Sequence, residues 1–136
     1  MYENLLANVP TDLWIGGQWR KSSDGQRFDV TDPATERKIA SVASATVEDA
    51  IAALDAAQAA FPAWAAKKPR ERGEILRKAF ELIMRDAERL AKLITVENGK
   101  ALPDSRAEVA YAAEFFRWNA EEAVRNLGSL STAPAS

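Results

Sequence analysis

The stretch PRERGEILRKAFELIMRDAERLAKLITVENG, from Pro69 to Gly99, has the clearest periodicity of the 136-residue chain and decides that its second half is helical. Its apolar residues recur at helical spacing, and most of its arginines lie outside the apolar face. Proline favours the first helical position and glycine a left-handed stop, which predicts one helix from Pro69 to about Glu97. The predicted buried stripe is Ile75, Leu76, Ala79, Phe80, Ile83, Ala87, Leu90, Leu93 and Ile94.

A shorter helix is predicted before this stretch, over residues 46–61. Thr46 and Asp49 are spaced as a capping pair, in which the hydroxyl satisfies a free amide and the acid lies near the positive end of the helix. Pro62 is expected to end or kink the helix, because proline has no amide hydrogen. The apolar stripe of this helix is Val47, Ala50, Ile51, Leu54, Ala57 and Phe61.

A third helix is predicted over residues 103–126. Tyr111, Phe115 and Trp118 widen its apolar surface well around the cylinder. Together with Phe116 they form either a ligand-stacking surface or a packing surface, and helical spacing favours packing. The face is wider than the other predicted elements can cover, which indicates a missing partner. The main stripe is Val109, Ala112, Ala113, Phe116, Ala120, Ala123 and Val124.

The first third of the chain predicts short strands over residues 13–43. Gly16 and Gly17 lie between the segments LWI and QWR, and Gly-Gly there is typical of a two-residue hairpin, because the turn needs positive φ. Two more strands are expected at 27–31 and 38–43, and apolar spacing makes the second one either covered on both faces or irregular. The order of elements predicts an α+β fold, with short antiparallel strands followed by three helices.

Composition limits the chemistry that this chain can perform. It has no cysteine and no histidine, which excludes disulfides and thiolate nucleophiles and removes the commonest general base. Eighteen basic and twenty acidic residues give a net charge of −2, and their interspersed signs disfavour nucleic acid binding. No apolar run approaches the roughly 18–20 residues that span a bilayer, and residues 1–10 lack signal-peptide order. We therefore expect a cytoplasmic protein without membrane contact.

No motif marks a complete active site. The six glycines form neither a GxGxxG nor a GxxxxGK arrangement, so no cofactor site is assigned. Glu114, Glu121 and Glu122 are better explained as helix-surface charges, with Glu121 in reach of Arg117 and Arg125, than as paired catalytic carboxylates. We assign no catalytic residue to this chain.

The sequence Glu97-Asn98-Gly99-Lys100 has two interpretations. Spacing favours an ordinary helix end, in which glycine stops the helix and lysine interacts with the dipole. In the other interpretation, Glu97 is an oxygen ligand for a hard monovalent cation.

Several motifs agree in order and spacing with one known family. A tryptophan-containing glycine hairpin is followed by FDVTDPAT, KIASV, an alanine-rich helix that closes in AFPAW, and a helix that ends in TVENGK. This order resembles the amino-terminal region of the aldehyde dehydrogenase superfamily, from about Leu13 to Gly128. The run EVAYAAEFFRWNAEEAVR, from Glu108 to Arg125, is most similar to the succinate-semialdehyde dehydrogenase branch.

The resemblance implies a parent enzyme that oxidises an aldehyde to a carboxylate with hydride transfer to NAD or NADP. Its catalytic cysteine, its oxyanion-stabilising groups and its water-activating glutamate would lie beyond Ser136. We therefore expect an amino-terminal fragment, a partial domain of an α/β enzyme, that has no catalysis and no bound nicotinamide on its own. The alternative is a non-enzymatic binding or regulatory module that docks on a full-length subunit. The particular aldehyde, the choice of NAD or NADP, and the origin and isolated folding of the fragment stay open.

The resemblance also implies particular sites and assemblies. A structural sodium or potassium ion would be held by backbone oxygens of Val30 and Thr31 and by the acid of Glu97. Ala107 and Tyr111 would line one wall of the aldehyde tunnel. In the parent, subunits form a dimer or tetramer. Glu36 stands where the family usually has a turn glycine.

The resemblance and the predicted elements together divide the chain into three parts. Residues 1–12 are expected to form a flexible arm. Residues 13–127 are expected to be the amino-terminal part of the cofactor-binding domain. Residues 128–136 are expected to begin the oligomerisation arm.

Overall fold

The computed structural model describes residues 3–126 and 128. The predicted α+β class is confirmed: short antiparallel strands come first and helices follow. In chain order the elements are α1 (Glu3–Leu6), β1 (Leu13–Ile15), β2 (Gln18–Arg20), β3 (Arg27–Thr31), β4 (Lys38–Ala43), α2 (Val47–Ala65), α3 (Pro69–Arg85), α4 (Ala87–Asn98) and α5 (Leu102–Glu122).

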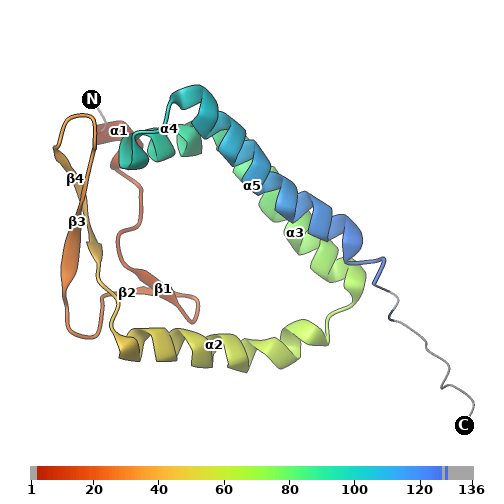
Figure 1. Ribbon diagram of the computed structural model, residues 1–136. Coiled ribbons are helices and arrows are strands. Elements are labelled where there is room, and N and C mark those ends of the chain that lie inside the picture. Colours follow the sequence, from red (N-terminus) through yellow and green to blue (C-terminus); the bar gives the residue numbers. More distant parts are fainter. Residues whose placement is uncertain (1–2, 127, 129–136) are drawn as a thin grey trace, which may run out of the picture.

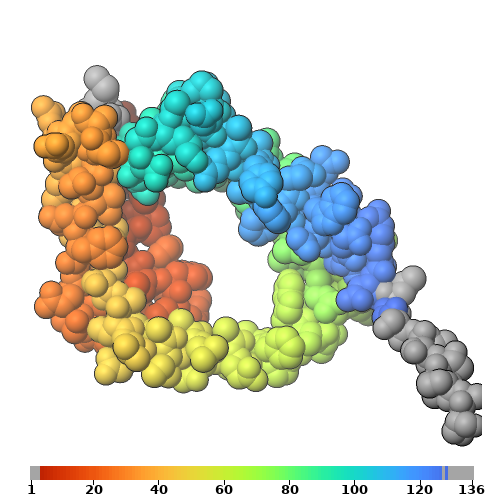
Figure 2. All heavy atoms as spheres, viewed as in Figure 1, coloured from red at the N-terminus to blue at the C-terminus, as the bar shows by residue number. Residues whose placement is uncertain are grey.

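The elements are arranged as an open frame. Figure 1 shows the β3–β4 ribbon along one side, α2 along a second and the α3–α5 pair along a third. The space-filling view retains an opening between them (Figure 2). Side chains therefore do not fill the centre of this arrangement, in contrast to the dense interior of a complete domain.

The glycine hairpin is confirmed. Strands β1 and β2 are antiparallel, and Gly16 and Gly17 have φ values of 61° and 82°. Trp14 and Trp19 face each other across the strands with ring centroids 5.0 Å apart. This pair remains more than half exposed, at 59% and 53%.

Strands β3 and β4 form the second antiparallel pair, with the predicted bounds. A register shift between Val30 and Thr31 makes the ladder irregular, which was one of the two expectations for this region. The turn between the strands is closed by Asp32, whose carboxylate accepts hydrogen bonds from the Ala34 amide at 2.8 Å and the Thr35 hydroxyl at 2.9 Å. Asp32 is 2% exposed, so the hydrogen bonds that stabilise the turn are made by a buried side chain.

Helix α2 begins with the predicted capping box of Thr46 and Asp49. Pro62 was predicted to end or kink the helix. The first alternative is wrong, because α2 continues past the proline to Ala65. The proline removes only the hydrogen bond to the carbonyl of Gln58. Gln58 lies in an exposed part of the helix, so water can replace that bond.

The long helix predicted over 69–97 is two helices, α3 and α4, separated at Asp86. Asp86 has φ −98° and ψ 10°, outside the helical range, and its carboxylate accepts hydrogen bonds from the Arg85 guanidinium at 2.7 and 2.9 Å. The apolar periodicity did not reveal this break, because the apolar residues before and after Asp86 keep the same helical spacing. Ile75, expected to be buried, is 47% exposed.

Helix α5 ends at Glu122 rather than near Asn126. Beyond it the chain tightens into a turn, in which the Arg125 amide donates to the Glu122 carbonyl at 2.9 Å. Such i+3 bonds are common where a helix ends.

The core lies where α5 packs on α3 and α4. Its small residues allow close approach, and a Cβ atom added at Gly73 would lie 2.8 Å from the Ala120 carbonyl oxygen. The hydroxyls of Thr95 and Ser105 hydrogen bond at 3.0 Å between α4 and α5. Among the described residues, the buried apolar side chains of this core are Ala91, Val96, Val109 and Ala113, and Ala43 at the end of β4 is also buried.

The expected amino-terminal arm contains the one-turn helix α1, which contacts α4. Its flexibility and the three-part division of the chain stay predictions. Within the described part of the chain, no helix combines the length and the apolar composition that crossing a membrane requires.

Candidate functional site

The strongest candidate for a ligand site is the place where the end of α4 meets the β3–β4 turn. Gly99 caps α4 in the left-handed conformation, with φ 76°, and its amide donates to the Thr95 carbonyl at 2.8 Å. A Cβ atom at Gly99 would lie 2.9 Å from Cγ of Pro33. The helix end that carries Glu97 therefore lies beside the turn that follows Val30 and Thr31.

Glu97 lies in the last turn of α4 and is exposed. It lines a pocket of about 310 Å³ with Ile94, Asn98, Lys100 and Glu108. The ammonium of Lys100 pairs with the carboxylate of Glu108, which leaves the Glu97 carboxylate outside that ion pair. Carboxylate and carbonyl oxygens suit hard cations.

Strand β3 ends at Thr31, two residues before Pro33. Val30 is half-buried, Thr31 is exposed, and the register shift lies between them. An irregular ladder leaves backbone groups free of regular pairing. The three predicted cation ligands thus come from adjacent segments, and their role stays a prediction.

The two predicted tunnel residues lie on α5. Ala107 and Tyr111 are one helical turn apart and both are exposed. The Tyr111 ring packs edge-on against Phe115, with centroids 5.0 Å apart. The buried residues Val109 and Ala113 lie on the other side of the helix, so the face with Tyr111 is available to other parts of a larger protein.

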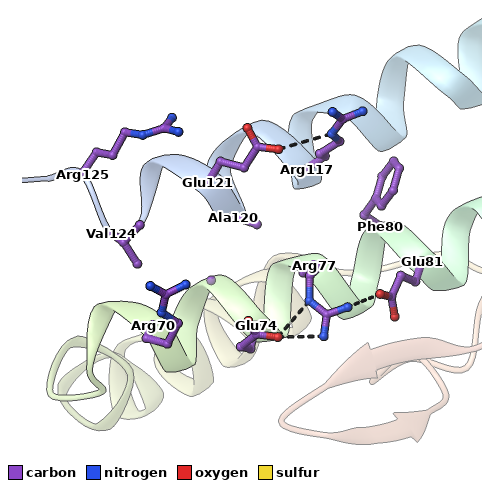
Figure 3. Close-up of a pocket in the computed structure, with 11 residues that line it drawn as sticks. Arg70, Glu74, Arg77, Phe80, Glu81, Arg117, Ala120, Glu121, Val124 and Arg125 are labelled. Atoms are coloured by element: carbon purple, nitrogen blue, oxygen red, sulfur yellow. Dashed lines mark hydrogen bonds and ion pairs between the residues drawn. The ribbon is translucent and has the colours of Figure 1, made fainter.

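A groove of about 500 Å³ between α3 and α5 was not predicted (Figure 3). Arginines and glutamates from both helices line it. Arg77 is paired with Glu74 at 2.7 Å and with Glu81, and Arg117 is paired with Glu121 at 3.3 Å. Hydrogen bonding to Glu74 is the main cause that raises the pKa of Arg77. Pairing with glutamates makes Arg77 and Arg117 poor anion ligands in this groove.

The expected partnership of Glu121 with both neighbouring arginines is partly wrong. Arg117 reaches Glu121 at 3.3 Å, and it also approaches Glu114 at 3.8 Å. Arg125 instead pairs with Glu122 at 2.5 Å. The chain turns after Glu122, which moves Arg125 away from the regular i+4 position.

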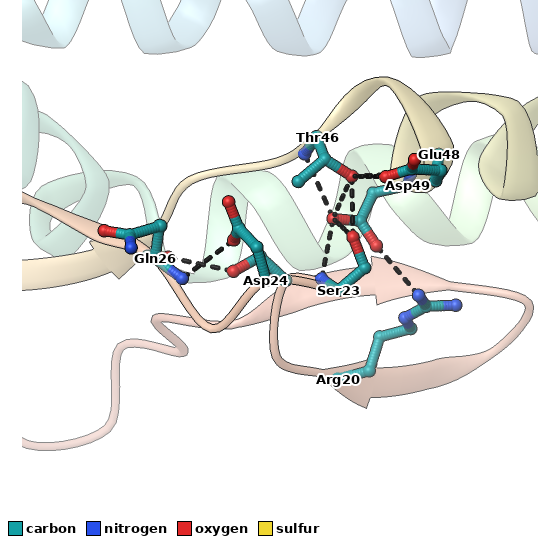
Figure 4. Close-up of polar contacts among 8 residues, drawn as sticks. Arg20, Ser23, Asp24, Gln26, Thr46, Glu48 and Asp49 are labelled. Carbon is teal, nitrogen blue, oxygen red and sulfur yellow. Dashed lines mark hydrogen bonds and ion pairs between the residues drawn. The ribbon is translucent and has the colours of Figure 1, made fainter.

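A second polar cluster joins the first hairpin to α2 (Figure 4). The buried carboxylate of Asp49 accepts hydrogen bonds from Arg20 Nη2 at 2.8 Å, the Ser23 amide at 3.0 Å and the Thr46 amide at 3.1 Å. The Ser23 amide contributes most to lowering the pKa of Asp49. Sequence reasoning found the cap and missed Arg20 and Ser23, because they lie 29 and 26 residues from Asp49.

The described residues do not contain a complete reacting centre. Within 3–126 and 128, no group of three or more acidic side chains could hold a metal ion. The described strands form two separate two-stranded antiparallel sheets, which lack the parallel strand, glycine loop and helix that cradle a dinucleotide. The described residues thus do not form a dinucleotide-binding unit of that kind.

The backbone matches part of a larger enzyme. It is similar to the crystal structure of an NADP-dependent enzyme of E. coli, with a TM-score of 0.90 and 38% identity, covering 98% of this chain and 27% of that one. The chain therefore has the fold of one segment of a larger enzyme.

The family follows from the sequence match. Residues 19–135 match the aldehyde dehydrogenase family model, and the chain belongs to that family. It is 54% identical over 96 residues to a succinate-semialdehyde dehydrogenase of Paenarthrobacter nicotinovorans, covering 71% of this chain and 21% of the relative.

A second relative agrees with the first. The chain is 43% identical over 114 residues to the NADP(+) succinate-semialdehyde dehydrogenase GabD of E. coli K12, covering 84% of this chain and 24% of the relative. The chain thus spans less than a quarter of the length of these two curated relatives. The predicted resemblance and its succinate-semialdehyde branch are confirmed as similarities.

Proposed function

We propose that this chain is the amino-terminal segment of an NAD(P)-dependent aldehyde dehydrogenase that oxidises succinate semialdehyde to the carboxylate. The observation that carries the proposal is the 54% identity over 96 residues to a succinate-semialdehyde dehydrogenase. The same branch is supported by the run EVAYAAEFFRWNAEEAVR. This run contributes residues to both the exposed side and the packed side of α5.

The role of the segment is to build part of the subunit rather than to react. Thiohemiacetal formation needs a cysteine thiolate, and the chain has no cysteine. The nicotinamide, which accepts the hydride in the parent reaction, would be held by other parts of the subunit. On its own the chain has no dehydrogenase turnover and binds neither NAD nor NADP.

Two sites in the chain would serve the complete subunit. Val30, Thr31 and Glu97 supply oxygens to a structural monovalent cation, and the contact between Gly99 and Pro33 supports their proximity. The cation would bridge helix α4 to the β3–β4 ribbon. Ala107 and Tyr111 form part of the aldehyde tunnel wall, and their exposure on one face of α5 supports this role.

The assembly follows the same proposal. Residues 13–127 belong to the cofactor-binding domain, and residues 128–136 begin an oligomerisation arm, of which all but Gly128 lie outside the described residues. The complete subunits form cytoplasmic dimers or tetramers.

A chimera tests this function. The segment of GabD that matches this chain is replaced by residues 1–136, and oxidation of succinate semialdehyde is followed by NADPH absorbance. We expect turnover, with succinate semialdehyde preferred over a longer semialdehyde. GabD without its matching segment is the control and should be inactive. A soluble, folded chimera without turnover would contradict the proposal.

The competing role is a regulatory module that docks on a complete subunit, and exposed apolar helix faces also favour it. Adding the chain to intact GabD separates the two roles. The segment proposal expects no change in turnover, because intact GabD already contains its own matching segment. Stoichiometric inhibition or activation would instead establish the module.

A further inference from the structure

The last residue of α4 is an asparagine followed by glycine. Asn98 ends the helix and is exposed, and Gly99 continues the chain in the left-handed conformation, with φ 76°. The other asparagines of the sequence precede leucine, valine or alanine, whose side chains shield the amide nitrogen that follows. Glycine has no Cβ and the least restricted backbone. The Gly99 nitrogen is therefore the least hindered of these amides.

An asparagine side chain in this position can cyclise with the backbone. The Gly99 amide nitrogen gives its proton to water and bonds to Cγ of Asn98, while the Cγ–Nδ2 bond breaks and ammonia leaves. Water then opens the cyclic imide. Opening at Cγ leaves aspartate, and opening at the main-chain carbonyl carbon leaves isoaspartate, whose backbone is longer by one methylene group. The net reaction is hydrolysis of an amide and needs only water.

The end of α4 opposes this ring closure in two ways. The Gly99 amide donates to the Thr95 carbonyl at 2.8 Å, and the imide nitrogen has no hydrogen, so this bond must break first. Asn98 is helical, and a helical ψ of about −42° turns the next nitrogen away from the side chain. A five-membered ring instead needs that nitrogen and Cβ nearly eclipsed. Cyclisation therefore requires the last turn of α4 to open.

The surroundings of this helix end decide how it opens. Val96, two residues before Asn98, is buried with 6% exposure, and the Cβ position of Gly99 lies 2.9 Å from Cγ of Pro33. The Asn98 side chain itself is exposed and lines a pocket of about 310 Å³. Local opening of a helix end costs less free energy than unfolding of the whole chain. Such opening is therefore the most accessible route to the reactive conformation.

We propose that Asn98 is a site of spontaneous deamidation, whose rate is set by local opening of the end of α4. The inference goes beyond the proposed function, because it needs no substrate, cofactor or second chain. The product places a carboxylate in the last turn of a helix, where the dipole is already negative. Glu97 and Glu108 line the same pocket, so the new charge is also repelled by its neighbours. Deamidation thus loosens the helix end that had restrained it.

Peptide mass spectrometry tests the proposal on the 136-residue chain. Samples are aged at mildly alkaline pH with and without urea and then digested with trypsin, which releases residues 93–100 as one peptide. Deamidation is measured as the mass change from NH to O. We expect the folded chain to react about tenfold more slowly than the chain in urea, or slower still, because its reactive conformation is a minor, open one.

Two variants separate local opening from unfolding of the whole chain. Val96→Ala removes buried contacts from the last turn of α4 and should speed deamidation of the folded chain several-fold. Gly73→Ala strains the contact of α3 with Ala120 on α5 and should leave the rate unchanged. Circular dichroism must show that both variants are folded. Hydrogen exchange of the same peptide should follow the deamidation rate, since both reactions require the Gly99 amide to lose its hydrogen bond.

Asn98→Gln is the chemical control. Its longer side chain would have to close a six-membered ring, so the peptide should keep its mass over the same time. Absence of conversion at Asn98 in urea would overturn the assignment of the site.

Two further outcomes overturn the inference. Equal rates in the folded chain and in urea would show that the helix end gives no protection. Equal acceleration by Val96→Ala and Gly73→Ala would show that unfolding of the whole chain is the reactive step. Neither result bears on the proposed function, which is measured by turnover of the GabD chimera.

Discussion

The carboxylate of Asp49 and the guanidinium of Arg20 form an ion pair at 2.8 Å, between the first turn of α2 and the end of β2. Asp49 is fully buried, whereas the Arg20 side chain is 42% exposed. The same carboxylate completes the capping box with Thr46. One acid thus starts the helix and fixes the hairpin against it.

Asp49→Asn should lower the melting temperature of the chain. The amide keeps the volume but loses the charge, and its NH₂ group cannot accept the hydrogen bonds that the second carboxylate oxygen receives. Thermal unfolding followed by circular dichroism measures the effect. Asp55→Asn, on an exposed part of the same helix, is the control and should melt like the unchanged chain. Equal melting of the two variants would contradict the role given to Asp49.

The pH dependence of stability has a defined sign at Asp49. Hydrogen bonds from the Ser23 and Thr46 amides, together with the charge of Arg20, lower its pKa from the ordinary value of 3.8. A lowered pKa in the folded state contributes stability above pH 3.8, and that contribution is lost as the pH falls through the lowered value. The Asp49→Asn variant should therefore lose less stability between neutral pH and pH 3 than the unchanged chain does.

Glu36→Gly should stabilise the β3–β4 turn. Glu36 has φ 57°, in the left-handed region that glycine adopts without strain. Relief of roughly 1–2 kcal/mol of strain, partly offset by the greater freedom of unfolded glycine, predicts a net gain of about 0.5–1 kcal/mol. Urea unfolding measures it. Glu36→Ala removes the same charge but keeps Cβ, so a similar gain in that variant would show that charge and not strain is responsible.

Local signals made much of this fold predictable. The glycine pair at 16 and 17 and the Thr46–Asp49 cap each depend on residues only a few positions apart. The sequence pattern therefore indicates the hairpin and the helix start directly. The break at Asp86 was missed because one residue outside the helical range does not disturb the apolar period. An uncovered face was expected on the third helix, but the exposure of Val47, Ile51 and Leu54 on α2 was missed. Their helical spacing indicates a packing face and does not say whether the covering protein is present.

The candidate site was predictable only through resemblance. Glu97 and Val30 are far apart in sequence, and no spacing rule connects them. The structure brings their segments together through the contact between Gly99 and Pro33. The α3–α5 groove escaped sequence reasoning, because its charges look like ordinary surface pairs in each helix taken alone.

Gly73→Ala should destabilise the helix pair α3–α5. The new Cβ would lie 2.8 Å from the Ala120 carbonyl oxygen, so the helices must move apart. Overpacking costs about 1–3 kcal/mol and the better helix propensity of alanine returns about 1 kcal/mol, which predicts a net loss of up to about 2 kcal/mol. Urea unfolding checks this, with exposed Lys78→Ala as control. Stabilisation by alanine would mean that the two helices do not limit each other.

Gly99→Ala should destabilise the junction of α4 with the β3–β4 turn. The left-handed φ of 76° costs alanine roughly 1–2 kcal/mol, and the new Cβ also crowds Pro33 at 2.9 Å. A double-mutant cycle with Pro33→Ala separates these causes. We expect a coupling of about 0.5 kcal/mol or more, because neighbours that clash are not additive. Strict additivity would show that the two segments are not in contact.

Glu97→Gln should weaken potassium binding in the GabD chimera. A cation that binds only the folded state stabilises it, by about 1.4 kcal/mol at ten times its Kd. The chimera should therefore melt higher in potassium chloride than in tetramethylammonium chloride at equal ionic strength, and Glu97→Gln should reduce the difference. Glu108→Gln is the control, because Glu108 lines the same pocket but pairs with Lys100. Equal potassium responses of the unchanged chimera and of Glu97→Gln would exclude Glu97 as a ligand, even if the chimera turns over substrate.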